Sequence, residues 1–348
     1  MIRVLYWSTL TVIFGSAMSN IKRLAVLTSG GDAPGMNACL RAIVLTASAC
    51  NIDVIGFKHG FNGLLEQEYQ KLQPHHVDNI IQRGGTILKS ARCPALELPD
   101  GPATAASALQ QLNIDALIVI GGDGSFRGTM AISKHFNGQL IGVPGTIDND
   151  VDGTDHTIGF ATALDTALDA IDKIRDTADA FERIFLIELM GRHTGYLSLA
   201  AGIAGGAEQI ICPEFGEVSP DNLKPVITPI KHAQLLQGKA SYLIVVAEHS
   251  YPGGTTALAA ALTQAIGIEC RACILGHIQR GGSPVGADRI LATKLGAFAV
   301  EQLMQGASLM MAGEVNGQAC LYPLAKTGDR NKATDPFLVR WQQQIGSF

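Results

Sequence analysis

The sequence predicts an α/β protein made of two doubly wound, mainly parallel sheet domains, with helices on both faces of each sheet and an active site in the cleft between the domains. Two observations predict this class. Short apolar runs alternate with segments in which apolar residues recur every three or four positions, as strands and helices do. Two of these runs, 116–120 and 140–143, stop at polar loops of the kind that bind ligands at the carboxyl edge of a parallel sheet. The 348 residues are enough for two domains.

The elements of the first half follow from this alternation. Strands are expected at 23–28, 53–57, 116–120 and 140–143. Helices are expected from about residue 37 to about 49, at 104–112 and at 162–179. The polar segment 67–82 is expected to contain a helical piece from about His75.

The second half repeats the pattern without a linker or low-complexity tract. Strands are expected at 183–189, 209–211, 242–246 and 272–275, and helices at 195–203, 221–236, 255–266 and 287–303. Alternation of this kind favours parallel sheets covered by helices.

Composition narrows the classes of partner. The net charge is -5 with no basic run, which argues against nucleic acid but leaves single basic residues to converge on a phosphorylated small molecule. The seven scattered cysteines indicate reduced thiols and a cytoplasmic location. Cys270 and Cys273 have C-x-x-C spacing, but no second pair or nearby histidine completes a zinc site.

Two glycine turns follow expected strands. Gly30-Gly31-Asp32 stands before a helix, where amides and the helix dipole favour a phosphate. Gly121-Gly122-Asp123-Gly124-Ser125 offers the same amides and a carboxylate suited to magnesium. Such turns also occur as plain strand caps and in kinases acting on NAD or lipids, so these alternatives stay open.

Thr146-Ile147-Asp148-Asn149-Asp150 is more specific. Alternate aspartates on an extended segment point the same way, so one can deprotonate a substrate hydroxyl while the other helps to hold a metal's water shell. A solvated acidic turn is the alternative.

Arginines and two further polar residues stand at strand or turn ends in the second half. Arginine is the planar, permanently charged donor best suited to phosphate, whereas a carboxylate can accept hydrogen bonds from sugar hydroxyls. The candidates are Arg183, Arg192, Arg271, Arg280, Glu248 and His277.

Taken together, these residues resemble the ATP-dependent 6-phosphofructokinases of bacterial type. The motifs TSGGDAPGMNA, IGGDGS, PGTIDND, GHIQRGGSP and DRILA occur in the family's order over roughly residues 21–310. The resemblance implies the phosphofructokinase fold, a Mg²⁺ cofactor, ATP as co-substrate and fructose 6-phosphate as acceptor. TIDND after GGDGS separates the chain from the NAD and lipid kinases.

The resemblance also implies site residues. The ATP site is implied at Gly30, Arg92, Cys93, Gly122, Asp123, Gly124 and Ser125, with Asp123 on the metal. The catalytic group is implied at Asp148 as general base, Thr146, Asp150 and Arg192. The substrate site is implied at Thr146, Ile147, Asp148, Arg183, Met190, Gly191, Arg192, Glu248, Arg271, His277 and Arg280. Arg183 and Arg271 are expected to reach a neighbouring subunit's 6-phosphate, which implies a homotetramer.

The phosphoryl donor is inferred from two small residues. Pyrophosphate users of this family carry a bulkier acidic residue at Gly124 and a lysine at Gly145, so glycine at both positions favours ATP. A pyrophosphate-dependent enzyme and a catalytically inactive regulatory subunit remain the alternatives.

The family's effector site for ADP or phosphoenolpyruvate is matched only in part. Arg41, Arg175, Glu208 and Lys239 match it, whereas Leu45, Gln237, Ala240 and Ser241 do not, so weak ADP activation is expected. Lys89 stands where the family has glycine, with an unknown effect, and the resemblance fades after about residue 310.

Domain limits follow from the resemblance. We expect 21–158 plus 278–328 to bind ATP and 159–277 plus 329–348 to bind fructose 6-phosphate. Residues 1–20 resemble a secretory signal, but the apolar run is short for a membrane span and an exported enzyme would meet no ATP. We therefore expect an over-long start, with Met18 as the first residue, and neither a membrane nor a nucleic acid as partner.

Overall fold

A computed structural model describes residues 21–237, 241–328 and 332–345. The expected start at Met18 lies outside these residues. The chain divides into two units. Unit 1 comprises Met1–Gly145, Gly153–Asp155 and Arg289–Asp329, and unit 2 comprises Thr146–Asp152, His156–Asp288 and Arg330–Phe348.

Unit 1 is built on a mainly parallel sheet in the order β12-β11-β5-β4-β1-β2-β3. Its strands are β1 (Arg23–Thr28), β2 (Asp53–Phe57), β3 (Tyr69–Leu72), β4 (Ala116–Gly121), β5 (Gln139–Thr146), β11 (Met310–Val315) and β12 (Gln318–Pro323). Neighbouring strands are parallel except β2 with β3 and β11 with β12. Every residue of β4 is buried, as its uninterrupted apolar sequence predicts.

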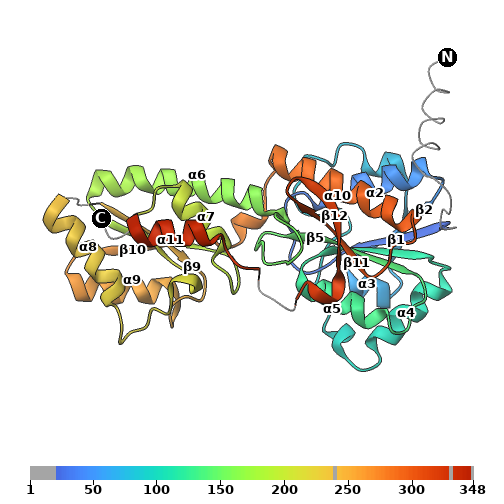
Figure 1. Cartoon of the computed structure of the whole chain (residues 1–348), viewed down its shortest axis with the longest axis horizontal. Coiled ribbons are helices and arrows are strands. Elements are labelled where there is room, and N and C mark those ends of the chain that lie inside the picture. Colours follow the sequence, from blue (N-terminus) through green and yellow to red (C-terminus); the bar gives the residue numbers. More distant parts are fainter. Residues whose placement is uncertain (1–20, 238–240, 329–331, 346–348) are drawn as a thin grey trace, which may run out of the picture. The chain divides into compact units, whose positions relative to one another are not determined.

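Helices cover both faces of this sheet. They are α2 (Met36–Ala49), α3 (Phe61–Leu65), α4 (Gly101–Gln111), α5 (Asp123–Ile132) and α10 (Gly286–Met304), with short 3₁₀ turns η1 (Pro74–Val77), η2 (Pro94–Glu97) and η5 (Leu324–Lys326). Figure 1 shows α2 and α10 on one side of the strands and α3, α4 and α5 on the other. One core cluster packs α3 and α4 against the sheet and includes Leu27, Phe57, Phe61, Leu109 and Leu117.

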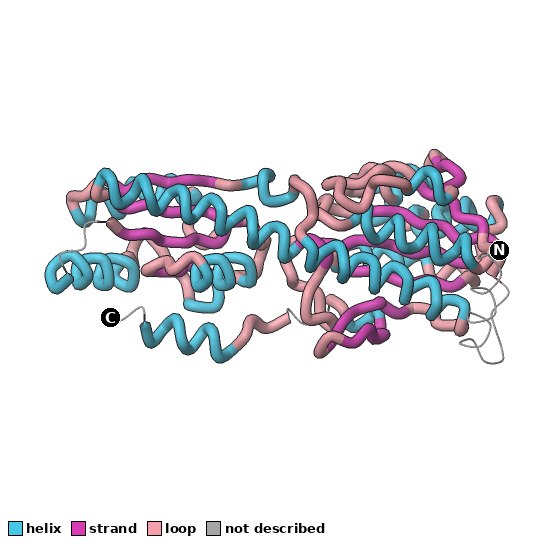
Figure 2. Tube along the Cα trace, turned by 90° about the horizontal axis from the view of Figure 1, so that it is seen from above, coloured by secondary structure: helices cyan, strands magenta, loops and turns pink. Residues whose placement is uncertain are grey.

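Unit 2 contains a smaller sheet in the order β10-β7-β9-β8, all parallel. The strands of this sheet are β7 (Ile184–Leu189), β8 (Gln209–Ile211), β9 (Tyr242–Ala247) and β10 (Cys270–Ile274), whereas the two-residue strand β6 (Ile158–Gly159) is counted with the larger sheet. The helices of unit 2 are α6 (Phe160–Phe181), α7 (Tyr196–Ala204), α8 (Lys224–Gln237), α9 (Gly254–Ile266) and α11 (Pro336–Ile345), with 3₁₀ turns η3 (Pro213–Phe215) and η4 (Gly276–Arg280). Within each unit, Figure 2 shows helices running alongside the strands.

The predicted α/β class with two mainly parallel sheets is confirmed. The helical piece expected from about His75 is present as the short 3₁₀ helix η1, but strand β3, in which residues 69–72 pair with β2, was not predicted. One local prediction is wrong. The loop predicted after β4 is brief, since helix α5 begins at Asp123.

Candidate active site

The glycine loops of unit 1 lie together at the carboxyl edge of its sheet. Thr28 pairs with Ile120 and Gly121 pairs with Pro144, so the ends of β1, β4 and β5 are adjacent. The Ser29 amide donates to the Ile120 carbonyl at 2.9 Å. A side chain at Gly121 would meet the Ser125 Oγ at 2.5 Å and the Ser29 carbonyl at 2.8 Å, so close packing of the loops requires glycine there.

Asp123 opens helix α5 directly after this edge. Its Oδ2 accepts a hydrogen bond from Arg127, whereas Oδ1 is buried and has no hydrogen-bond partner among the described residues. A buried acceptor without a protein partner is suited to a bound ion or water. The described residues hold no group of three or more His, Cys, Asp or Glu side chains able to bind a metal. Asp123 therefore fits a cation that takes most of its oxygens from phosphates and water, as Mg²⁺ does.

The segment 90–93 borders Gly30. The Ser90 hydroxyl donates to the Gly30 carbonyl at 2.8 Å, and the Gly30 amide donates to the Ala91 carbonyl at 3.4 Å. Arg92 is exposed, and Cys93 packs partly against the core, where burial raises the pKa of its thiol. The structure thus brings Arg92 and Cys93 to the same edge as the glycine loops.

Asp148 is the centre of a charged cluster in unit 2. Its side chain is 7% exposed, and its Oδ1 is buried without a hydrogen-bond partner among the described residues. Burial, followed by the negative charge of Asp150, raises the pKa of Asp148 to about 6. Arg280 lowers this pKa, Glu248 raises it, and Arg192 lowers it. Four charged residues, three of them far from Asp148 in the sequence, therefore act on one carboxyl.

The backbone between the two aspartates corrects one prediction. Asn149 has φ 52°, so Asp148 and Asp150 do not lie on an extended segment and the geometric argument for their common direction is wrong. Asparagine adopts this left-handed conformation more readily than most residues. The Asn149 Oδ1 accepts the Thr157 amide at 3.0 Å, which fixes the turn.

Thr146 and Ile147 precede Asp148. The Thr146 Oγ1 accepts the Asp148 amide at 3.2 Å, and the Thr146 carbonyl accepts the Thr157 hydroxyl at 2.6 Å. Ile147 is fully buried, so its side chain packs in the interior and does not reach the surface. Thr157 was not identified from the sequence.

Glu248 holds the loop that carries Met190, Gly191 and Arg192. Its Oε1 accepts the Gly191 amide at 3.1 Å and the Arg192 amide at 2.6 Å. Arg192 has φ 59°, a conformation that an arginine adopts only when its surroundings impose it. The carboxylate that the sequence assigned to sugar binding therefore also shapes the arginine loop.

Glu269, which sequence reasoning missed, joins two predicted phosphate ligands. Its Oε2 lies 3.0 Å from the Arg183 Nε, and its Oε1 accepts from Arg271 at 2.7 and 2.9 Å. The hydrogen bond from Arg271 lowers the pKa of Glu269, and the charge of Arg183 does so as well. His277 and Arg280 lie on the turn η4, where His277 is exposed.

A family model described as phosphofructokinase matches residues 23–303, about four-fifths of the chain. The chain belongs to the phosphofructokinase family. It is 50% identical over 325 residues to ATP-dependent 6-phosphofructokinase 1 of Thermus thermophilus, covering 93% of this chain and 99% of that protein.

Solved phosphofructokinases share the fold. The enzyme of Saccharomyces cerevisiae matches with a TM-score of 0.77 and 33% identity, over 93% of this chain and 46% of that one. The enzyme of Pichia pastoris in the T-state matches with a TM-score of 0.80 and 32% identity, over 95% of this chain and 37% of that one. This chain thus spans less than half the length of the yeast chains.

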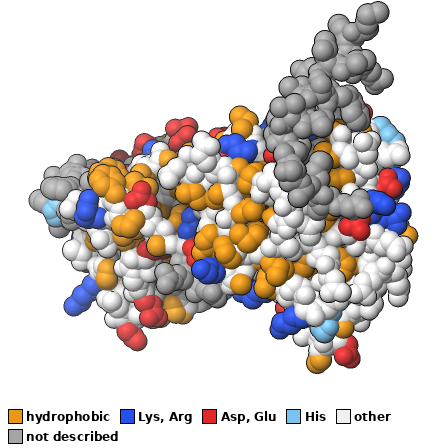
Figure 3. All heavy atoms as spheres, turned by 45° about the vertical axis from the view of Figure 1, so that its right-hand side comes forward, with side chains coloured by type: hydrophobic (Ala, Val, Ile, Leu, Met, Phe, Trp, Pro, Cys, Tyr) orange, Lys and Arg blue, Asp and Glu red, His pale blue; other side chains and the backbone are white. Residues whose placement is uncertain are grey.

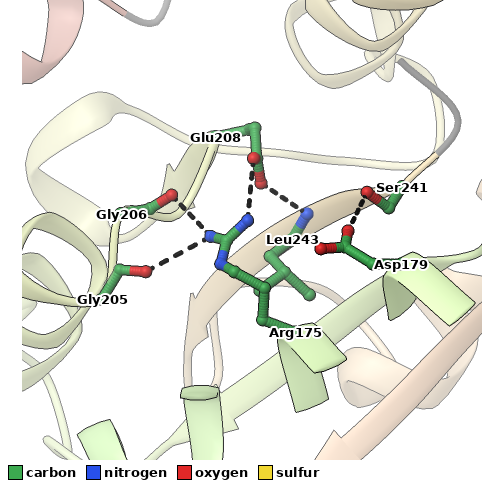
Figure 4. A network of polar contacts seen from close by, with 7 residues as sticks. All are labelled: Arg175, Asp179, Gly205, Gly206, Glu208, Ser241 and Leu243. Atoms are coloured by element: carbon green, nitrogen blue, oxygen red, sulfur yellow. Dashed lines mark hydrogen bonds and ion pairs between the residues drawn. The ribbon is translucent and has the colours of Figure 1, made fainter. Parts of the chain in front are cut away.

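Two of the residues that resemble the family's effector site interact with one another. Figure 4 shows Arg175 between Glu208 and the carbonyls of Gly205 and Gly206. The Arg175 Nη1 lies 3.0 Å from the Glu208 Oε1, while the Glu208 Oε2 accepts the Leu243 amide at 2.8 Å. Arg41 lies on α2 in unit 1, and Lys239 lies outside the described residues.

Within the part of the chain that the structure describes, no helix is both long and apolar enough to span a membrane.

Proposed function

We propose that this protein is an ATP-dependent 6-phosphofructokinase, which transfers the γ-phosphoryl group of ATP to the 1-hydroxyl of fructose 6-phosphate and releases fructose 1,6-bisphosphate and ADP in the cytoplasm. The observation that carries the proposal is the buried Asp148 carboxyl, which the charges of Arg280 and Arg192 influence, in a member of the phosphofructokinase family. Its relatives, at 43 to 50% identity, include ATP-dependent 6-phosphofructokinases that match 93% of the chain.

Asp148 is the general base in this proposal. A carboxyl whose pKa is raised to about 6 is ionised at neutral pH and is a stronger base than an exposed aspartate. It takes the proton of the sugar 1-hydroxyl as that oxygen attacks the γ-phosphorus. Thr146, whose Oγ1 accepts the Asp148 amide, and Asp150, whose charge raises the Asp148 pKa, set the environment of this base.

Phosphoryl transfer otherwise needs positioning and positive charge. Arg192 neutralises charge on the transferring group, and Glu248 keeps its loop in place. Gly30, Arg92, Cys93 and the amides of Gly122–Ser125 hold the nucleotide, so that unit 1 binds ATP and unit 2 binds the sugar phosphate. Mg²⁺, held by the Asp123 Oδ1, would neutralise the nucleotide phosphates.

The substrate phosphate is assigned to arginines at the edge of the second sheet. Met190, Gly191, Arg192, Glu248, His277 and Arg280 contact fructose 6-phosphate in the same subunit. Arg183 and Arg271, which share Glu269, reach the 6-phosphate bound by a neighbour in a homotetramer. Figure 3 shows apolar side chains at the surface of one face of the molecule. Phe181, Ile274 and Ile278, each within four residues of a proposed phosphate-binding arginine in the sequence, are exposed apolar residues.

ATP rather than pyrophosphate is the proposed donor. A side chain at Gly145 would lie 2.9 Å from the Ile120 Cγ2 and 3.2 Å from the Met36 Cε, so a lysine would require these two side chains to move. ADP or phosphoenolpyruvate is expected to act weakly on the Arg41, Arg175, Glu208 and Lys239 positions.

The test is a coupled assay of fructose 1,6-bisphosphate formation with purified full chain, fructose 6-phosphate and either ATP or pyrophosphate. We expect turnover with Mg²⁺ and ATP, and a loss of roughly 10²-fold or more in Asp148→Ser. Turnover with pyrophosphate alone would reassign the donor. Inactivity with both donors would identify a regulatory chain, and near-normal turnover of Asp148→Ser would reject the base.

A further inference from the structure

The segment after residue 331 contacts the turn that carries Asp148. The Lys332 Nζ lies 3.1 Å from the Asn149 Oδ1, so an ammonium group binds the residue between Asp148 and Asp150. Lys332 lies beyond residue 303, where the family match ends, and no residue of this segment was among the predicted site residues.

Lys332 is itself held in place. Its ammonium lies 4.9 Å from the centre of the Tyr196 ring, and the Tyr196 hydroxyl donates to the carbonyl of the next residue, Ala333. A cation over an aromatic face is stabilised by the ring quadrupole. Tyr196 begins helix α7, so two consecutive residues of the C-terminal segment are fixed on one element.

Helix α11 anchors the same segment. Leu338 and Val339 pack against a buried cluster of Leu199, Ile210, Cys212 and Ala247. Ala247 is the last residue of β9 and immediately precedes Glu248. The segment 332–345 is therefore packed against unit 2, in a position that allows Lys332 to contact Asn149.

Asn149 transmits this contact to the base. It holds a left-handed conformation, and its Oδ1 accepts both the Thr157 amide and Lys332. The Thr157 hydroxyl in turn donates to the Thr146 carbonyl. Lys332, Asn149, Thr157 and Thr146 thus form one chain of hydrogen bonds around the Asp148 turn.

We propose that Lys332 is a positioning residue for phosphoryl transfer, which fixes the Asp148 turn through Asn149. The inference rests on the proposed function, because it assigns Lys332 a part in the same reaction. Lys332 does not touch substrate in this assignment, and it acts on turnover rather than on affinity.

The test compares the full chain carrying Lys332→Met, Lys332→Arg or the control Lys326→Met, which neutralises an exposed lysine of unit 1. We expect Lys332→Met to lower kcat about ten- to a hundredfold with little change in KM for either substrate, because a small displacement of a reacting group costs this much. Lys332→Arg should recover most of the loss and Lys326→Met should match the parent. Unchanged kcat in Lys332→Met, or a rise in KM alone, would overturn the inference.

A double-mutant cycle separates positioning from general destabilisation. If Lys332 acts through Asn149, the double variant Asn149→Ala with Lys332→Met should be as slow as Asn149→Ala alone. If the double variant instead loses kcat by the product of the two single-variant factors, the inference is contradicted. The acidic limb of the pH–rate profile should not move in Lys332→Met, because the cations that lower the Asp148 pKa are Arg280 and Arg192.

If Lys332→Met does not fold, the variant Tyr196→Phe tests the same contact. Tyr196→Phe removes the hydroxyl that binds Ala333 and keeps the ring beneath Lys332. It should lower kcat by a smaller factor than Lys332→Met, and full kcat in every folded variant would reject the inference. The parent protein is measured in the same assay. Inactivity of the parent would reject the proposed function, whereas an active parent with an active Lys332→Met would reject only the role of Lys332.

Discussion

The Glu248 Oε1 and the amide nitrogen of Arg192 lie 2.6 Å apart, in a hydrogen bond that joins the end of β9 to the loop after β7. Because Arg192 has φ 59°, the bond stabilises a conformation that costs on the order of 1–3 kcal/mol. A residue in the proposed substrate site is therefore also needed to shape the site.

Replacing Glu248 tests both roles. Glu248→Ala removes acceptor and charge, so we expect kcat/KM to fall roughly a hundredfold, whereas Glu248→Gln keeps a carbonyl acceptor and should lose roughly tenfold, because charged hydrogen bonds are about twice as strong. Steady-state kinetics with Glu217→Gln as an exposed control measures this. Equal losses in the two Glu248 variants would show that the loop contact has no part in the effect.

Asp148 should make stability depend on pH. Its pKa is raised from 3.8 to about 6, so the folded state binds the proton more tightly than the unfolded state does. The contribution of Asp148 to the free energy of unfolding is therefore greatest below about pH 4, and it falls as the pH rises from about 4 through 6. At pH 8, Asp148→Asn should be more stable than the parent by on the order of 2–3 kcal/mol.

Denaturant unfolding at pH 8 and near pH 4 measures this difference, which should shrink at the lower pH. Asp221→Asn, at an exposed turn, is the control. A stabilisation independent of pH would contradict the raised pKa of Asp148. The same pKa predicts that kcat/KM falls as pH is lowered through about 6.

Arg127 competes with the proposed cation for Asp123. The ion pair joins an arginine side chain that is 65% exposed to a carboxylate that is 17% exposed, so it contributes little stability. Arg127→Met should lower the Mg²⁺ concentration for half-maximal rate about two- to fivefold, and Asp123→Asn should raise it. A Mg²⁺ titration of the rate, with Lys134→Met as the exposed control, is the measurement. An unchanged Mg²⁺ requirement in Asp123→Asn would show that Asp123 does not bind the metal.

Gly328 packs against the same carboxylate. A Cβ at this position would lie 2.3 Å from the Asp123 Oδ1, whereas a Cβ at Gly286 meets nothing within 4 Å. Gly328→Ala should therefore displace the carboxylate and raise the Mg²⁺ requirement about tenfold, a change of about 1.4 kcal/mol in binding. Gly286→Ala should leave the rate and the Mg²⁺ requirement unchanged. Parent-like kinetics in both variants would show that the Asp123 side chain is free to move.

The two glycines that favour ATP should respond differently to substitution. A Cβ at Gly124 is no closer than 3.8 Å to its nearest neighbour, so Gly124→Asp should fold normally and raise the KM for ATP. Gly145→Ala should lower the unfolding free energy by about 1–3 kcal/mol, because its Cβ would press on Ile120 and Met36. Thermal unfolding and ATP saturation curves separate the two effects, and a stable Gly145→Ala would contradict the tight packing.

The strands at the centre of both sheets could be predicted because burial on two faces leaves a continuous apolar run. β1, β2 and β8 match their predicted limits, and β4 extends one residue further. Helix α5 was missed because Asp123-Gly124-Ser125 are weak helix formers whose place is set by the end of β4. β11 and β12 pair with each other in antiparallel fashion and lie near the sheet edge, where partly exposed strands lack a continuous apolar sequence.

The site residues that the sequence did not reveal act on partners rather than on substrate. Thr157 and Lys332 reach Asn149 from positions 8 and 183 residues away, and such separations leave no local pattern. Glu269 had a usable signal, since it directly precedes β10 and stands two positions before Arg271, a spacing at which side chains of an extended chain share a face. Asn149 had one as well, because asparagine between two aspartates is suited to a turn.

The order of strands in unit 1 has a consequence for synthesis on the ribosome. β5 receives β11 as its neighbour in the sheet path, but β11 begins at Met310, roughly 160 residues after β5 ends at Thr146. Because the ribosome adds about 5–20 residues per second, β11 is synthesised on the order of ten seconds or longer after β5, and much of the β5 edge lacks its partner during this time. A nascent chain thus presents unpaired amides and carbonyls during elongation, when chaperones that cover open sheet edges would matter most for yield.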